Sequence, residues 1–435
     1  MNFYFTTLKI KSFKYLIVIF IFASLDNLYG QSTTKSPYSK YGIGVLRPSG
    51  FAQNFAMGGL SIANRSLLNI NVSNPASYTS LALTTFEIAG MWNSTWLKDE
   101  TQTQYLNNGY INYLSFAFPV INKKWGASFG LLPYSSVGYK YNYTIPDPLV
   151  GDIEYYYEGT GGINKAYIGN AFSMKMDSTI DLSVGFNASY LFGEFYYDEK
   201  YVFSDIPNAY NIWKYHRKNT GGFAFDFGLQ LTKQLNDKKS ITLGATYALG
   251  NDLNTNQSTL IQSFTGTVNN GLIKDTTLNE KNINDTISIP STYSVGIVFN
   301  NLEKLTIGFD FKLTDWSSNK TSNTLYSIKN TFNTAVGVEY IPDAKAFNHY
   351  LKMVKYRAGI RYGTYYVAIN NQDITEYAIS FGASLPFKRT FSTVNFGIEY
   401  GNKGITNNNL FKEEFININF GVTINDRWFI KRKYD

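Results

Sequence analysis

One rhythm runs through most of this chain, from about residue 85 to residue 424: every second residue is apolar, and turn residues interrupt the pattern at intervals. In the stretch 223–231, Phe and Leu occupy the odd positions, whereas Ala, Asp, Gly and Gln occupy the even ones. The stretches 307–314 and 416–424 repeat this alternation. A period of two is typical of a β-strand with one apolar and one polar face. Because the strands are long and aromatic, the pattern predicts an all-β fold, a transmembrane antiparallel barrel that is apolar toward lipid and polar toward its lumen.

The start of the chain has the features of an export signal. Lysines precede an apolar run over residues 15–25, and a cleavage site follows at Gly30. Residues 1–30 are therefore predicted to be a signal peptide. Neither this run nor any later stretch approaches the ~20 apolar residues that a spanning helix needs. Any membrane span of the mature protein is expected to consist of strands.

The composition excludes several classes of site. The chain has no cysteine, which rules out disulfides, thiolate metal sites, a cysteine nucleophile and a lipoprotein anchor. Its formal net charge of +7 comes from scattered bases without the clustered basic face that nucleic-acid binding requires. The aromatic share of 17% suits a lipid boundary, and an aromatic-rich soluble β-sandwich is the alternative.

The pattern predicts about fourteen strands, an even number that suits a single-chain barrel. We expect them at residues 84–97, 110–120, 124–144, 153–175, 180–203, 212–231, 240–250, 286–300, 304–317, 332–340, 355–368, 375–387, 393–401 and 414–425. Short connections alternate with longer ones, of which 251–285 is the longest. Short turns are expected on the periplasmic side and long loops outside. Trp316 is expected near an outer strand end, in an interfacial girdle.

The fifty or so residues between the signal and the first strand lack a lipid-facing period. They contain the glycine pair Gly58 and Gly59 and the turn sequence Asn74-Pro75-Ala76. Glycines permit close backbone approach, and Asn-Pro favours a turn. We expect residues 31–82 to form a hatch that plugs the lumen, and residues 83–435 to form the barrel.

With these features the chain resembles the FadL-type family of outer-membrane channels for long-chain fatty acids and hydrocarbons, including uncharacterised members from Bacteroidota. The resemblance rests on the predicted barrel and on a hatch motif formed by Gly58, Gly59, Asn74, Pro75 and Ala76. It implies a fourteen-stranded barrel with an amino-terminal hatch and a porin-like transport role. The chain departs from the family's transporters in its short hatch and in the lack of recognisable apolar ligand pockets. Related PorV-like barrels bind protein partners in secretion, so the resemblance leaves the role open.

The chain offers little for catalysis. After the signal it has only His216 and His349, neither with a Ser or carboxylate partner at a diagnostic spacing. Two separated histidines also make a poor metal site. We therefore expect no enzymatic activity, no metal and no cofactor.

Charged residues at alternate strand positions are expected to point into the lumen. They are Asp226, Asp310, Lys312, Arg357, Arg361 and Glu399. They could lock the wall to the plug or line a solute path, and the alternative is a hydrated, self-neutralising lumen of structural use only.

Two functions remain open at this stage. The first is an outer-membrane channel for small hydrophobic or amphipathic, fatty-acid-like solutes, surrounded by membrane lipid and lipopolysaccharide. The second is a non-enzymatic barrel subunit or scaffold of an outer-membrane secretion or assembly complex, which would bind a protein partner. A nucleic-acid partner is not expected in either case.

Overall fold

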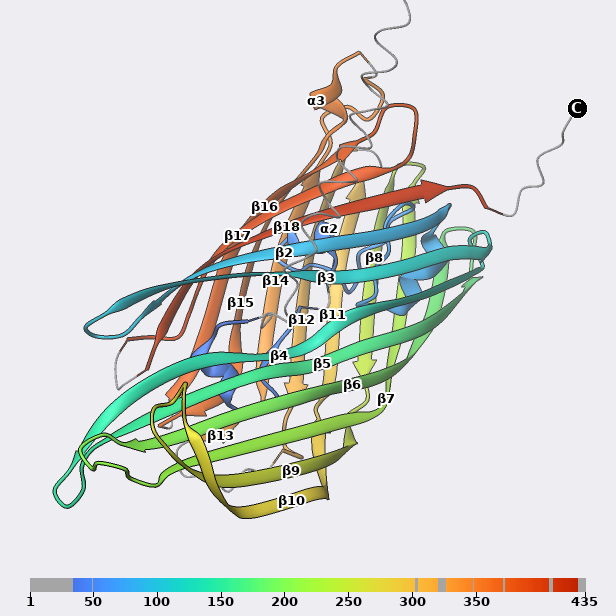
Figure 1. Ribbon diagram of the computed structural model, residues 1–435. Helices are drawn as coiled ribbons and strands as arrows, with labels where there is room; N and C mark the ends of the chain where they lie inside the picture. Colours follow the sequence, from blue (N-terminus) through green and yellow to red (C-terminus); the bar gives the residue numbers. More distant parts are fainter. Residues whose placement is uncertain are drawn as a thin grey trace, which may run out of the picture. The chain divides into compact units, whose positions relative to one another are not determined.

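The strand periodicity is realised as one large antiparallel sheet, seen in the computed structural model of Figure 1. The structure describes residues 34–428, with gaps at 49, 302–303, 320–325, 347, 371 and 407–409. The predicted signal peptide lies outside the described residues. No helix in the described part is both long and apolar enough to cross a membrane.

Short elements precede the first long strand. They are the 3-10 helix η1 (Pro37–Lys40), the strand β1 (Val45–Leu46), the helix α2 (Ala52–Phe55) and the 3-10 helix η2 (Pro75–Ser80). We call residues 34–83 the N-terminal segment. One further short helix, α3 (Tyr350–Met353), lies in the connection between two late strands.

Long strands form the rest of the chain. They are β2 (Thr84–Lys98), β3 (Thr103–Ile121), β4 (Trp125–Asp147), β5 (Gly151–Lys175), β6 (Ile180–Phe203), β7 (Asn211–Asn236), β8 (Lys239–Ala248), β9 (Asn251–Thr265), β10 (Leu272–Ile289), β11 (Ser291–Asn301), β12 (Leu305–Asp315), β13 (Tyr326–Ile328), β14 (Thr331–Tyr340), β15 (Lys355–Ile369), β16 (Gln372–Pro386), β17 (Thr393–Lys403) and β18 (Lys412–Asp426).

Fourteen of these strands close into a barrel, which confirms the predicted fold class. Leaving out β1, β9, β10 and β13, each strand pairs with its neighbour in the circuit, and β18 pairs with β2 from Lys412–Lys98 to Asp426–Thr84. Closure leaves no free edge along that seam, as a membrane barrel requires. The alternative of a soluble sandwich is thereby excluded.

The expected long loop at 251–285 is instead mostly a hairpin, β9 and β10. The outer half of β7 pairs with β9 and its inner half pairs with β8, so the hairpin continues the sheet beyond the barrel. The residues expected as a loop after Lys98 likewise extend β3 back to Thr103. The long-strand end is the outer end, and the end with short turns is the periplasmic one.

The two faces of the wall differ as the alternation predicts. Phe309, Phe225 and Ile360 are 43%, 40% and 57% exposed and form part of an apolar outer face. Their neighbours in sequence point inward, where Asp310 is only 6% exposed. Lipid is the solvent that such an outer face fits.

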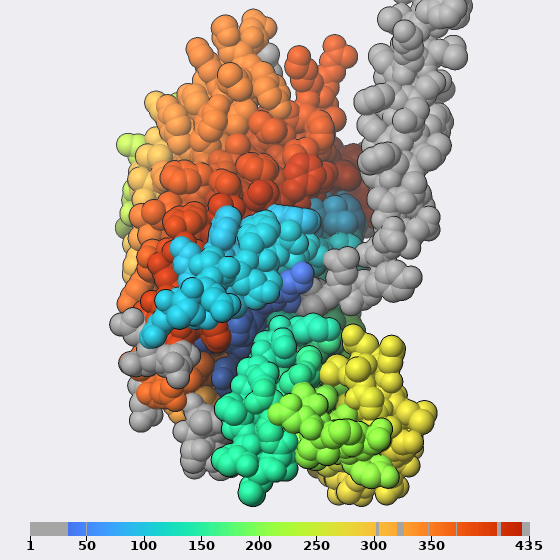
Figure 2. All heavy atoms as spheres, turned by 60° about the vertical axis from the view of Figure 1, so that its left-hand side comes forward, coloured from blue at the N-terminus to red at the C-terminus, as the bar shows by residue number. Residues whose placement is uncertain are grey.

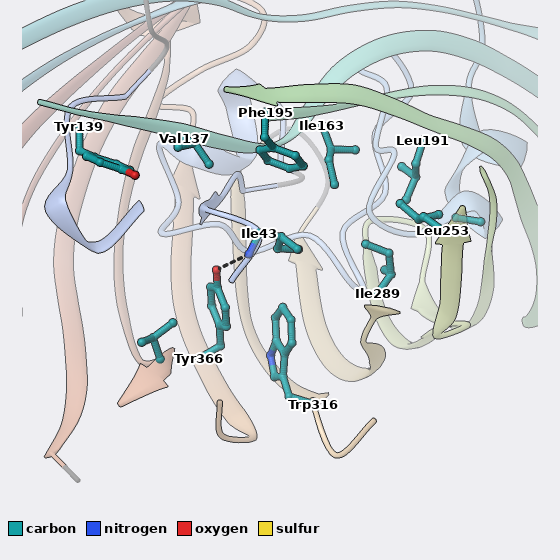
Figure 3. Packing of buried hydrophobic residues seen from close by; sticks show 12 residues of the cluster. Ile43, Val137, Tyr139, Ile163, Leu191, Phe195, Leu253, Ile289, Trp316 and Tyr366 are labelled. Carbon is teal, nitrogen blue, oxygen red and sulfur yellow. Dashed lines mark hydrogen bonds between the residues drawn. The ribbon is translucent and has the colours of Figure 1, made fainter. Parts of the chain in front are cut away.

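An apolar cluster lies in the outer half of the lumen (Figure 3). Ile43 of the N-terminal segment lies between Phe195 of β6 and Trp316, and Trp316 stacks on Tyr366 of β15 at 4.3 Å between ring centroids. Trp316 is 2% exposed, so its expected place in an interfacial girdle is wrong. Burial inside the barrel takes precedence here over the general preference of tryptophan for interfaces.

Candidate functional site

The N-terminal segment lies inside the barrel and contacts strands all around it. Its residues meet inward-facing glycines of the wall, at which a side chain would not fit. A Cβ at Gly359 of β15 would lie 2.1 Å from the backbone of Met57, and one at Gly244 of β8 would lie 2.3 Å from the carbonyl oxygen of Ile62. Close backbone approach on both sides of the lumen follows from these glycines.

Two buried wall carboxylates hold the backbone of the segment. Asp310 of β12 accepts hydrogen bonds from the amides of Ser61 and Ile62, at 2.6 and 2.8 Å. Glu87 of β2 accepts from the amide of Ile70 at 2.7 Å. Amides that would otherwise be orphaned in a loop are thus satisfied by carboxyl oxygens of the wall.

Neutral and basic side chains complete the attachment. Tyr113 of β3 accepts from the amide of Ala52 at 2.9 Å. Arg65, in the segment, donates to Ser183 of β6 and Gln230 of β7 at 3.0 and 2.9 Å. Burial lowers the pKa of Arg65 to about 10, so it stays charged at neutral pH.

The start of the segment is tied to the outer ends of β17 and β18. The Ser36 and Tyr38 hydroxyls donate to the Glu413 carboxylate and the Phe411 carbonyl, respectively. Burial, and then the nearby Glu413 carboxylate, raise the pKa of Tyr38, which remains a proton donor. The Lys403 ammonium lies 5.0 Å from the centroid of the Tyr38 ring.

The residues of the predicted hatch motif occupy two tight points of the segment. Gly58 and Gly59 have φ values of +70° and +90°, and a Cβ at Gly58 would meet the Ile360 carbonyl oxygen at 2.9 Å. Asn74 caps η2 by accepting from the amide of Ala76 at 3.1 Å, and its side-chain amide donates to the Ile62 carbonyl at 2.7 Å. Pro75 then occupies the first position of η2.

Three of the predicted luminal charges form pairs within the wall instead of contacts to the segment. Arg361 pairs with Glu399 at 2.8 Å and with Glu376 at 2.5 Å. Arg357 pairs with Glu339 at 2.7 Å. Among the described residues the Arg357, Arg361 and Glu399 side chains form no hydrogen bond to the segment, so the lock between wall and plug that the luminal charges could form is not made by them.

A second charged group lies across the lumen. Lys165 of β5 forms an ion pair with Asp226 of β7, and Lys312 of β12 points into the same cavity. Lys312 has no ion pair with a described carboxylate within the same cavity. The predicted charges therefore separate into an anchor, Asp310, and groups that form ion pairs within the wall, with Lys312 lining the cavity.

A cavity of about 380 Å³ lies between the N-terminal segment and the wall, and we call it the chamber. Both apolar and charged side chains line it: Leu46, Leu132, Leu191, Leu249, Ile289, Lys165, Asp226, Asp310, Lys312, Arg361, Glu376, Glu399 and Lys403. Such a lining can accept a molecule with an apolar body and a polar end.

The barrel wall splits on one side of the chamber. Among the described residues, β3 and β4 pair only between Ile121–Trp125 and Leu114–Leu131. Farther out, β3 pairs with β2 and β4 pairs with β5, so the two strands part. Figure 2 shows the blue N-terminal segment at the bottom of the hollow between cyan β3 and teal β4. We call this opening the slot.

One arginine of the segment bridges the slot. β1 pairs with Ser135 and Ser136 at the edge of β4. The Arg47 guanidinium donates to Ser136 Oγ at 3.1 Å and to the Tyr110 hydroxyl of β3 at 2.8 Å. Arg47 also lines the chamber, so it lies between the chamber and the slot.

The histidines lie far from this region and from each other in the chain. His216 Nδ1 lies 2.9 Å from Thr259 Oγ1, where β7 pairs with β9, and His349 precedes α3 in the connection between β14 and β15. Within the described residues no cluster of His, Asp and Glu could hold a metal ion.

Several contributors were not identified from the sequence. These are Glu87, Arg47 and Tyr113. Each forms a hydrogen bond to a residue that lies 17 to 89 positions away in the sequence. Only Glu87 could have been found from the sequence pattern, because the alternation in β2 places its carboxylate on the luminal face.

Comparison with known proteins supports this architecture. The profile of a family described as BamG matches residues 10–435. The chain belongs to the BamG family. With its apolar outer face and FadL-type barrel, this BamG-family protein is an outer-membrane protein.

Solved FadL-type channels share the fold of this BamG-family chain at low sequence identity. The toluene transporter TodX of Pseudomonas putida has 15% identity and a TM-score of 0.55, over 88% of this chain and 100% of that one. A FadL homologue of Pseudomonas aeruginosa has 13% identity and a TM-score of 0.53, over 87% and 98%. The toluene transporter TbuX of Ralstonia pickettii has 12% identity and a TM-score of 0.52, over 87% and 99%. No curated protein matches the chain in sequence.

Proposed function

We propose that this protein is an outer-membrane channel for small amphipathic solutes, fatty-acid-like in having an apolar body and a polar end. The observation that carries the proposal is the chamber, which has the slot at its side and is bounded by Arg47. A solute would exchange between the outer leaflet and the chamber through the slot. The step makes and breaks no bond.

The mixed lining of the chamber favours amphipathic solutes over pure hydrocarbons. Leu191, Leu249 and Ile289 offer apolar surface, whereas Lys312 and the ion pair of Lys165 with Asp226 bring charge to the lining. A purely apolar guest would leave those charges without compensation for lost water. The names of the structural neighbours, toluene transporters and a monoaromatic hydrocarbon channel, support a hydrophobic component in the solute.

The N-terminal segment would act as the hatch of this channel, with residues 31–82 as the hatch and residues 83–435 as the barrel. Its backbone is held by Asp310 and Glu87, and its Ile43 contributes to the apolar cluster at the outer end. Passage straight through the lumen then requires the segment to move, whereas passage through the slot requires only Arg47 to move.

The test is to fill the chamber. Thr246→Trp and Ala335→Trp each place an indole where the chamber is now open. Purified protein is incubated with lauric acid, and retained ligand is measured by native mass spectrometry. We expect the wild type to retain lauric acid and the two variants to lose most of it, because the volume is limited to about 380 Å³.

A matched control uses the lipid face. Val295 of β11 is 55% exposed on the outside of the barrel, so Val295→Trp should leave retention unchanged. Equal retention in all four proteins would place the ligand outside the chamber and refute the channel proposal.

A second candidate function is a membrane subunit of an assembly complex. The apolar cluster in the outer half of the lumen suits a sealed barrel, and the family name BamG suggests an assembly context. Copurification of a protein at fixed stoichiometry, without any lipid-like ligand, would favour this candidate.

A further inference from the structure

Three turns at the periplasmic end each carry two adjacent bases. They are Lys123 and Lys124 between β3 and β4, Lys238 and Lys239 between β7 and β8, and Lys388 and Arg389 between β16 and β17. All six side chains are exposed. Asp237 is the one acidic residue among the residues of these turns.

Several bases at the opposite end of the barrel have carboxylate partners. Lys140 pairs with Glu158 at 2.8 Å, and Lys329 pairs with Asp373 at 2.6 Å. Arg217 pairs with Glu194. None of the ion pairs between described residues involves a base of the three turns. These periplasmic bases are therefore available to an external anion, whereas Lys140, Arg217 and Lys329 at the outer end are neutralised within the protein.

The three turns are spread around the barrel. Along the closed circuit they are separated by four, six and four strands. A protein that docks on one side of the barrel would reach one or two of them. A layer that surrounds the barrel would reach all three, and the headgroup layer of the membrane is such a layer.

Each basic pair lies beside an exposed apolar residue of the lipid-facing wall. Ile121, Leu235 and Phe387 are 52%, 48% and 49% exposed and lie within four residues of the bases in sequence. An apolar residue in the acyl region with a long base beside it is the arrangement by which lysine reaches headgroup phosphates.

Two of the bases also occupy unfavourable backbone positions. Lys123 and Arg389 have φ values of +60° and +65°, in the left-handed region where Gly or Asn is favoured. The turns thus carry charge at positions where backbone conformation alone would select another residue.

We propose that these three turns form a basic collar that binds the phosphate groups of anionic phospholipids in the inner leaflet of the outer membrane. Attraction of bases to an anionic leaflet is general electrostatics and does not depend on the cargo of the channel. The collar would fix the depth and orientation of the barrel in the bilayer.

The experiment measures lipid preference. Full-length protein is reconstituted in equal amounts of phosphatidylethanolamine and phosphatidylglycerol, and the lipids retained are counted by native mass spectrometry. We expect at least about fivefold enrichment of phosphatidylglycerol, the ratio that corresponds to about 1 kcal/mol per contact. Enrichment should fall at 1 M salt, where the screening length is about 3 Å.

The collar variant replaces all six bases with Gln, and the matched control replaces Lys140, Lys274 and Lys329 at the outer end. Heat-modifiable gel mobility checks that both barrels are folded, and the three pairwise double variants serve if the sextuple variant is not. We expect the collar variants to lose enrichment and the control to keep it. Equal enrichment in all proteins, or equal loss in collar and control, would overturn the proposal.

Discussion

The wall and the N-terminal segment satisfy the same physical requirement in opposite ways. In the wall, backbone groups bond to the neighbouring strand, and side chains only need to alternate in polarity. In the segment, backbone amides depend on particular side chains of the wall, such as Asp310 and Glu87. The wall can therefore tolerate many changes that keep its rhythm, whereas the segment depends on a few specific contacts that lie far away in the sequence.

Removing the segment tests this comparison most strongly. Deletion of residues 31–71 should leave a folded barrel, because the fourteen-strand circuit closes through β2 and β18 without it. We expect single-channel conductance in planar bilayers to rise several-fold as the lumen opens. If the deletion variant folds but conducts no more than the parent, the segment does not close the lumen.

The alternation of apolar and polar residues in the wall can be disrupted at one position. Phe309→Arg puts a charge on the lipid face near mid-membrane and should cost about 2–4 kcal/mol of unfolding free energy. Thr246→Arg on the luminal side should escape that cost, since Thr246 lines the chamber. Denaturant unfolding in bilayers ranks the two variants, and equal losses would show that the assigned faces are wrong.

A specific contact of the segment can be removed without changing the apolar lipid-facing positions of the wall. Asp310→Ala leaves the amides of Ser61 and Ile62 without their acceptor, at a cost of about 1–3 kcal/mol. Hydrogen exchange should accelerate in the segment and stay slow in the strands. Asp226→Ala, which removes a wall ion pair with Lys165, is the control and should leave exchange in the segment unchanged.

The smallest expected effect concerns the slot. Arg47→Ala removes the bonds to Tyr110 and Ser136, worth about 1 kcal/mol each. Faster hydrogen exchange in β1 and at the free edge of β4 is the expected readout. Lys40→Ala is the control, because it loses a hydrogen bond to Tyr141 of β4 but none to β3, and it should not separate the two strands. A similar acceleration of hydrogen exchange in both variants would show that Arg47 does not bridge β3 and β4.

The sequence predicted the wall far better than the interior. Lipid on one side and polar groups on the other impose a period of two, so strands such as β5 and β6 were placed within a few residues of their observed bounds. β9 and β10 escaped prediction because they extend beyond the membrane, where no apolar face is required. Their exposed, mostly polar pattern resembles that of a loop.

The contacts inside the barrel could not be predicted from alternation. Alternation indicates that Asp310 and Arg361 face inward, yet their partners depend on how a segment without periodicity folds inside the barrel. Asp310 binds that segment, whereas Arg361 pairs with Glu376 and Glu399. Arg47 has no sequence signal at all, because its role arises only where β3 and β4 part.

The seam between β2 and β18 joins the first long strand of the chain to the last. Because the N-terminal segment precedes β2 and contacts the wall on all sides, we expect it to be in place when this seam closes. The ladder from Lys412–Lys98 to Asp426–Thr84 would then be the final step of assembly, and it would enclose the segment behind it. For this protein the order of events during assembly would matter as much as the energies of the finished contacts.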